Sequence, residues 1–312
     1  PIYLDEKEGV IATQYQMKEL EDLGLLKIDF LGLKNLSNIQ RTIDYIKKYK
    51  NIDIELYKIP LDDKKVFEML SQGDSTGVFQ LESTGIRKIM KRLKPNKLED
   101  IVALLALYRP GPLQSGMVDD FINRKNGKEK IEYPHKNLEI ILKETYGVIL
   151  YQEQVMKIAS YMANYSLGEA DLLRRAMGKK NFAIMRENRE KFIQRAVENN
   201  YTEEKADEIF ELIDKFAGYG FNKSHSVAYA MISYWTAYLK AHYPAFYFAA
   251  IMTSEISETG DVAYYFNDAK EHRISIYPPN VNTPSAYFEI KNDGISYSLA
   301  AIKNLGLNLA KK

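Results

Sequence analysis

Apolar residues recur at intervals of three and four along most of this chain, which is the spacing of one face of an α-helix. The pattern is clearest in residues 86–93, where one stripe contains Ile86, Ile89, Met90 and Leu93. Helical spacing continues from residue 35 to about residue 270, with breaks at prolines and glycines. This long stretch is therefore predicted to be α-helical.

Two stretches depart from the helical pattern. Residues 1–24 are predicted to form loop and helix, and the nearly continuous apolar run 25–33 is predicted to be a buried strand. After about residue 271, the strand-like segments 286–290 and 295–299 flank the turn-forming residues 291–294, which predicts a hairpin. The expected fold is mainly α with a small β portion.

Composition excludes several classes of protein. The chain has 312 residues and a hydrophobic content of 46%, which fits a globular protein, and it contains no apolar run near the roughly 20 residues that span a bilayer. It has no cysteine, so disulfides and thiolate metal sites are excluded and a reducing cytoplasm is expected. A net charge of +1 means that nucleic-acid binding has to be argued from local clusters of charge.

The segment 218–226 combines a glycine-flanked turn with a cluster of polar side chains directly before a long aromatic helix. Glycines let backbone amides approach an anion closely, and a helix start offers N–H groups and a positive dipole end. Asn222, Lys223 and His225 can donate hydrogen bonds to phosphate or sugar oxygens, and Tyr219 lies in the same turn. Tyr234 and Trp235, further along the helix, are expected to be packing residues. The segment predicts an anion or nucleotide site.

Two adjacent arginines, Arg174 and Arg175, lie on a helix that a capping box is predicted to open at Ser166. Neighbours on a helix point about 100° apart, so the two guanidinium groups can hold separate oxygens of one triphosphate. Lys179 follows near the helix end. An exposed basic helix end, favoured by the helix dipole, explains the same residues. From these residues alone, the dipole explanation is the stronger one.

A basic run without any acidic residue extends from residue 87 to residue 97. Its cations are Arg87, Lys88, Lys91, Arg92, Lys94 and Lys97. Such a run usually marks a solvated helix face. Because cations that are not interleaved with acids repel one another, a DNA phosphate backbone is the favoured partner of this face.

Four sequence segments together resemble the alpha subunit of bacterial DNA polymerase III, the family C replicative polymerases. They are Lys27-Ile28-Asp29-Phe30-Leu31-Gly32-Leu33, Arg109-Pro110-Gly111-Pro112-Leu113-Gln114-Ser115-Gly116-Met117, Arg174-Arg175-Ala176-Met177-Gly178-Lys179-Lys180 and Gly218-Tyr219-Gly220-Phe221-Asn222-Lys223-Ser224-His225-Ser226. The resemblance implies a central fragment. Its parts are the end of the palm with a palm strand (1–34), the helical fingers (35–270) and a small β-containing piece leading into the helix–hairpin–helix and clamp-binding region (271–312).

The same resemblance implies the chemistry. Asp29 matches one of three palm aspartates that hold two Mg²⁺ ions, and Lys27 is an expected phosphate contact; the other two aspartates have no credible match here. Arg174, Arg175 and Lys179 are expected to hold the phosphates of the incoming dNTP. Tyr219, Asn222, Lys223 and His225 are expected to position that nucleotide, and Arg109 and Gln114 to support the pocket or to be structural.

The activity implied is template-directed DNA synthesis in the bacterial cytoplasm. Its expected partners are a dNTP, primer–template DNA and the other subunits of the polymerase III holoenzyme, with no membrane partner. With one of three carboxylates present, the isolated chain is expected to be inactive. Two alternatives are a non-catalytic nucleotide- and DNA-binding module and a helical scaffold for protein interaction.

Overall fold

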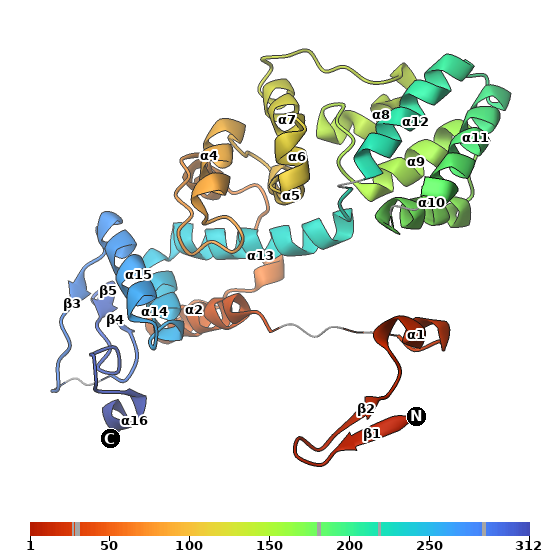
Figure 1. Ribbon diagram of the computed structural model, residues 1–312. Coiled ribbons are helices and arrows are strands. Elements are labelled where there is room, and N and C mark those ends of the chain that lie inside the picture. The colour runs from red at the N-terminus through yellow and green to blue at the C-terminus, as the bar shows by residue number, and fades with distance from the viewer. Residues whose placement is uncertain (27, 29–31, 180–181, 218–219, 283–284) are drawn as a thin grey trace. The chain divides into compact units, whose positions relative to one another are not determined.

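Helices make up most of this computed structural model, as the spacing of the apolar residues predicts (Figure 1). The structure describes residues 1–312 except 27, 29–31, 180–181, 218–219 and 283–284; the side chains of 18, 21, 178–179, 182–184 and 217 are also outside the description. The chain divides into two compact units, residues 1–34 and 35–312. No helix in the described part is long and apolar enough to cross a membrane. The three-part division expected from the sequence stays a prediction.

The first unit contains a hairpin that the sequence did not predict. Strand β1 (Ile2–Asp5) pairs antiparallel with β2 (Val10–Thr13), and helix α1 (Met17–Asp22) follows. The turn closes through a hydrogen bond of 2.7 Å from the Gly9 amide to the Asp5 carbonyl oxygen. Gly9 has a positive φ of 67°, which glycine adopts without strain. The prediction of loop before the helix was therefore wrong for residues 2–13.

The prediction of a buried strand at residues 25–33 is also wrong for the residues that the structure describes. None of these is in a strand, and Leu26 and Ile28 are 83% and 62% exposed. A strand needs a backbone partner. In the described part of this unit, β1 and β2 pair with each other and no described residue of 25–33 pairs with either strand. Lys27 and Asp29 lie outside the described residues.

The second unit contains two hydrophobic cores. The first is built mainly by α2 (Lys34–Lys50), α3 (Lys64–Ser71), α4 (Thr84–Leu93), α5 (Leu98–Leu107), α7 (Met117–Lys125), α13 (Lys223–His242), α14 (Pro244–Ser254) and α15 (Thr259–Glu271). The short helix α6 (Pro110–Gln114) connects α5 to α7. The second is built mainly by α8 (Glu139–Leu142), α9 (Gln152–Ala163), α10 (Leu167–Lys179), α11 (Phe182–Glu198) and α12 (Glu203–Ala217). Short 3₁₀ turns lie at Leu56–Lys58, Lys136–Leu138 and Lys143–Thr145. Met117 packs against both cores.

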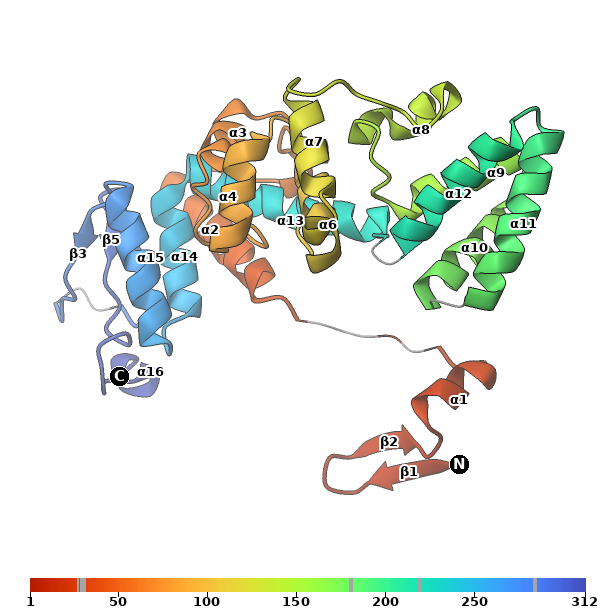
Figure 2. The ribbon, with the colours of Figure 1, turned by 45° about the horizontal axis from the view of Figure 1, so that its top comes forward.

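Helix α13 is the central element of the first core, and it packs against α3, α5 and α14 (Figures 1 and 2). Its buried polar side chains are bonded to the surrounding loops. The Tyr234 hydroxyl donates to the Pro60 carbonyl oxygen at 2.6 Å, and the Ser233 hydroxyl donates to that of Phe79 at 2.8 Å. Tyr234 and Trp235 are both buried, which confirms that they are packing residues.

The C-terminal part forms a small sheet in the order β3–β5–β4, from β3 (Ile276–Tyr277), β4 (Glu289–Lys291) and β5 (Gly294–Ser296). Strands β4 and β5 are antiparallel, which confirms the predicted hairpin. Asn292 and Asp293 in the turn both have positive φ, as tight hairpins require. Phe288 and Ile295 bury this sheet against the first core, and α16 (Leu307–Ala310) ends the chain.

Candidate functional site

The predicted glycine turn leads directly into the first residue of α13. Asn222 caps the helix, because its Oδ1 accepts a hydrogen bond of 2.8 Å from the His225 amide. Gly220 packs so closely on Phe216 that an added Cβ would lie 2.6 Å from the ring. A larger residue at Gly220 would therefore displace the turn.

The start of α9 is joined to this turn by hydrogen bonds. The Gln152 amide donates to the Phe221 carbonyl oxygen at 2.9 Å, and its side-chain Nε2 donates to the Gly220 carbonyl oxygen at 3.1 Å. Glu153 accepts from the Lys223 amide at 3.0 Å and from Asn222 Nδ2 at 3.0 Å. A carboxylate of the chain itself therefore occupies the electropositive start of α13.

Lys223 is held by a second carboxylate. Its ammonium lies 2.7 Å from Glu144 and 5.4 Å from the centre of the Tyr151 ring. Burial raises the pKa of Tyr151, and the nearby carboxylates of Glu144 and Glu153 raise it further, so this phenol stays neutral. Lys223 is thus a positioned cation at the entrance of α13.

The two predicted phosphate-binding arginines converge on one carboxylate. Arg174 Nε and Arg175 Nε each donate to Asp171, at 2.8 Å, one to each carboxylate oxygen. The predicted capping box is present, with Ser166 and Glu169 bonded reciprocally at 2.9 and 3.3 Å. Helix α10, which bears these arginines, packs on α9, whose first residue holds the glycine turn.

Aromatic rings in contact continue from the turn along α13, with Phe221 and His225 meeting edge to face. The Arg109 guanidinium lies 3.9 Å from the centre of the Phe221 ring, and burial lowers its pKa. His225 stacks on Tyr229 at 4.3 Å between ring centroids. Arginine keeps its charge even when desolvated, so Arg109 brings a fixed cation to the turn.

The structure places Asn222, Lys223 and His225 at the start of α13, where α9 is bonded to the turn. Arg174 reaches the same junction, because its Nη1 lies 3.5 Å from Gln152 Oε1, whereas Arg175 bonds to Asp171. Sequence reasoning missed the polar partners that hold them, which are Glu144, Gln152, Glu153 and Asp171. The one sequence signal that could have pointed to these partners was the polar start of α9, which directly follows the buried Tyr151. Tyr219 and the Lys179 side chain lie outside the described residues.

The basic run covers the exposed face of α4, opposite the buried stripe of Ile86, Ile89, Met90 and Leu93. Arg87 donates to the Thr76 hydroxyl at 2.8 Å and to Tyr264 at 3.0 Å, and Arg92 pairs with Asp119. In the part of the chain that the structure describes, no hydrogen-bond or ion-pair partner holds the side chains of Lys88, Lys91 and Lys94.

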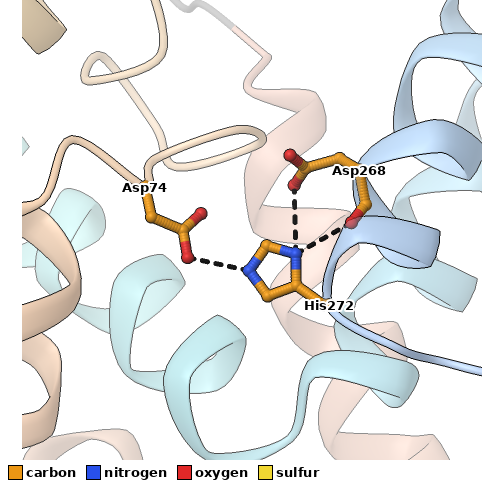
Figure 3. A group of neighbouring side chains, drawn as sticks. All are labelled: Asp74, Asp268 and His272. Atoms are coloured by element: carbon orange, nitrogen blue, oxygen red, sulfur yellow. Dashed lines mark hydrogen bonds and ion pairs between the residues drawn. The ribbon is translucent and has the colours of Figure 1, made fainter.

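Among the described residues, Asp74, Asp268 and His272 are the one group with the types and spacing of metal ligands (Figure 3). The Lys240 ammonium already bridges this group, at 2.6 Å from Asp74 and 3.1 Å from Asp268. His272 Nε2 lies 2.7 Å from a carboxylate oxygen of Asp74, and its Nδ1 lies 2.8 Å from the Asp268 carbonyl oxygen. Both neighbours only accept hydrogen bonds, so both ring nitrogens must donate. His272 is an imidazolium here and has no lone pair for a metal.

The group is therefore a balanced ionic cluster of two cations and two carboxylates. Burial alone would raise the pKa of Asp74, but His272 and Lys240 lower it to about 2. The hydrogen bond to Asp74 raises the pKa of His272. The cluster joins the loop after α3 to α13 and α15, and its role is structural.

Comparison with known proteins gives a consistent result. The family described as bacterial DNA polymerase III alpha subunit finger domain matches residues 35–200. The chain is similar to DNA polymerase III subunit alpha of Aquifex aeolicus, with 53% identity over 100% of the chain and 27% of that protein. The same subunit of Bacillus subtilis is 51% identical over 97% of the chain and 27% of that protein. The chain thus spans little more than a quarter of the length of these relatives.

The ionic cluster predicts a pH dependence of stability. Because the folded pKa of His272 is raised, its stabilisation is complete below the unfolded value of about 6.5 and is lost as pH rises through the folded pKa. Urea unfolding measured from pH 6 to pH 9 should show the free energy of unfolding falling with pH, and His272→Gln should remove that fall.

His135→Gln is the matched control, because burial lowers the pKa of His135 and its contribution has the opposite sign. This variant should keep the fall. An unchanged pH profile in His272→Gln would contradict the assignment of His272 as an imidazolium.

Proposed function

The chain belongs to the family of bacterial DNA polymerase III alpha subunits, and from this membership we propose that it supplies the surface that binds the incoming dNTP and the primer–template. The reaction it serves is transfer of a deoxynucleotide from a dNTP to a primer 3′-hydroxyl, directed by a template. The protein works in the bacterial cytoplasm with the other subunits of the polymerase III holoenzyme.

One observation carries this proposal: Arg174 and Arg175 each direct a guanidinium to a different oxygen of the same acid, Asp171. A phosphate offers the same kind of oxygen acceptors to the same donors. These hydrogen bonds lower the pKa of Asp171, so the carboxylate stays ionised and keeps both arginines oriented. The side chains of Arg174 and Arg175 are 31% and 65% exposed, so a ligand can reach them, although Arg174 Nη1 also donates to Gln152 Oε1 at 3.5 Å.

The glycine turn supplies the second half of the pocket. Gln152 holds the Gly220 carbonyl and Glu153 fixes the Lys223 amide, so the turn has a defined position at the start of α9. In the proposal, Arg174, Arg175 and Lys179 bind the triphosphate, while Tyr219, Asn222, Lys223 and His225 orient the sugar and base. Arg109, stacked on Phe221, supports the turn from the other side.

The metal requirement is proposed from the family. Asp29 would hold Mg²⁺ with carboxylates that this chain does not supply, and Lys27 would contact a phosphate. When bound, Mg²⁺ would supply activation of the primer 3′-hydroxyl and neutralisation of the leaving pyrophosphate. The cluster around His272 does not fit that role, because its histidine is protonated and a lysine ammonium bridges its acids.

The basic face of α4, with Arg87, Lys88, Lys91, Arg92 and Lys94, is proposed to contact the DNA backbone.

The phosphate role of the arginines is tested in a DNA polymerase III alpha subunit that contains this sequence. Removing charge-assisted hydrogen bonds worth about 1.5–3 kcal/mol should reduce kcat/KM for the dNTP about tenfold to hundredfold in Arg174→Ala and in Arg175→Ala. Steady-state primer extension measures this loss, and primer–template affinity should stay nearly unchanged.

Arg186→Ala is the matched control, because Arg186 is an exposed arginine on α11 that pairs with Glu190. It should behave like the unsubstituted subunit. Loss of DNA affinity with normal use of the dNTP would show that Arg174 and Arg175 contact the DNA backbone instead, and would overturn the proposal.

The metal role gives a second prediction. Asp29→Asn in the same subunit should abolish primer extension with an unchanged circular-dichroism spectrum, because an amide cannot replace an ionised ligand of Mg²⁺. The purified 312-residue chain should extend no primer. Ordinary extension by the Asp29→Asn subunit would remove this residue from the metal site, and extension by the chain alone would contradict the need for further carboxylates.

A further inference from the structure

A cleft of about 370 Å³ lies between the C-terminal end of α4 and the C-terminal end of α7. It is lined by Lys91, Arg92, Lys94, Ile122, Asn123, Asn126 and Lys128. Four of these seven residues are cations, two are amides, and none is a carboxylate. The volume falls within the range of small-molecule sites, and the lining suits an anion.

Most of the positive charge in this cleft is unpaired. Arg92 pairs with Asp119. Over the part of the chain that the structure describes, no hydrogen-bond or ion-pair partner is present for the side chains of Lys91, Lys94 and Lys128, all of which are exposed. Like charges held close together repel each other, so they favour a ligand that brings negative charge.

Stabilisation of the helix ends does not account for these lysines. Cations near a helix C-terminus commonly bind its last carbonyl groups. Here other residues already do so, since Lys125 Nζ donates to the Lys94 carbonyl oxygen at 3.0 Å and Asn126 Nδ2 donates to that of Arg92 at 2.9 Å. The lysines that line the cleft are therefore not needed to bind these carbonyl groups.

The walls of the cleft are fixed by buried contacts. Leu93 and Ile122 belong to the first core, and Lys125 forms an ion pair of 3.3 Å with Asp100 in which both side chains are almost fully buried. Gly127 adopts a positive φ of 68°, and the Lys128 amide then donates to the Asn123 carbonyl oxygen at 2.8 Å. The chain thus turns back and places Lys128 at the cleft.

We propose that this cleft binds the phosphodiester backbone of a nucleic-acid strand, which extends the proposed DNA surface from α4 to α7 and rests on the proposed function. Lys88 and Lys91 are three residues apart and neighbour each other on α4, and Lys94 follows as the residue that caps the end of this helix. Cations that continue from the exposed helix face into a cleft match an extended polyanion. A free phosphate would fill the cleft alone and leave Lys88 unused.

The test measures binding of a labelled single-stranded oligonucleotide to the 312-residue chain. Fluorescence anisotropy gives the affinity at each of a range of salt concentrations. Each phosphate contact on a single strand contributes about 0.7 to the slope of log affinity against log salt. The triple variant Lys91→Gln/Lys94→Gln/Lys128→Gln should therefore lose about 2 from the slope and bind about tenfold or more weakly. Lys91→Arg/Lys94→Arg/Lys128→Arg should keep the affinity of the unsubstituted chain.

The charge-matched control is Lys47→Gln/Lys48→Gln/Lys50→Gln, which removes three lysines from the last turn of α2, away from the cleft. It should bind as the unsubstituted chain does. If the unsubstituted chain binds DNA and the two glutamine variants bind it equally well, the assignment of the cleft as a DNA site is overturned. The proposed function is then unaffected. No DNA binding by the unsubstituted chain would overturn both. If inorganic triphosphate displaces the strand at matched phosphate concentration, the cleft is a small-anion site and the strand assignment is wrong.

Discussion

The junction between the start of α9 and the start of α13 is the contact on which the candidate site depends. Gln152 and Glu153 bind the Gly220–Lys223 turn through both backbone and side-chain groups. Because the buried amide of Gln154 also accepts from the Leu150 and Tyr151 amides, at 2.8 and 3.0 Å, the segment before α9 is fixed as well. An unpaired buried amide would cost about 1–3 kcal/mol, so these bonds strongly favour one geometry. Arg174 of α10 reaches this junction through Gln152, whose Oε1 lies 3.5 Å from its Nη1.

Helix α13 carries that geometry into the rest of the second unit. It offers buried polar groups at several turns, which bond to different neighbouring elements. Ser226 donates to the Val102 carbonyl oxygen of α5 at 2.6 Å, and Lys240 binds Asp74 in the loop after α3 and Asp268 on α15. The Lys240 side chain is fully buried, so the ionic cluster can be stable only while the two carboxylates compensate the charges of both Lys240 and His272. Two hydrogen bonds, from Thr76 to Asp268 and from Arg87 to Thr76, link this cluster to the basic face of α4. One helix therefore positions both the proposed nucleotide surface and the proposed DNA surface.

The sequence predicted what depends on local patterns. The stripe of Ile86, Ile89, Met90 and Leu93 identified α4, Ser166 and Glu169 identified the start of α10, and the turn at Asn292 and Asp293 identified the β4–β5 hairpin. It could not predict pairings between distant residues, such as Glu153 with Lys223, which lie 70 positions apart. The apolar run at 25–33 was misassigned because periodicity does not show whether a strand has a neighbour to bond with. The predicted arginines were identified, but their shared carboxylate, Asp171, was overlooked because an acid three or four residues before a cation also fits an ordinary helix pair.

The central claim is that α10 and the glycine turn form one binding surface for one ligand. Hydrogen–deuterium exchange tests it most directly, because local protection on binding is read segment by segment. The measurement compares an alpha subunit containing this sequence, bound to primer–template, with and without the next complementary dNTP. The account predicts that the segments around Arg174 and around Lys223 gain protection together, at the same dNTP concentration. Protection of only one of them, or of neither under conditions where the primer is extended, would contradict it.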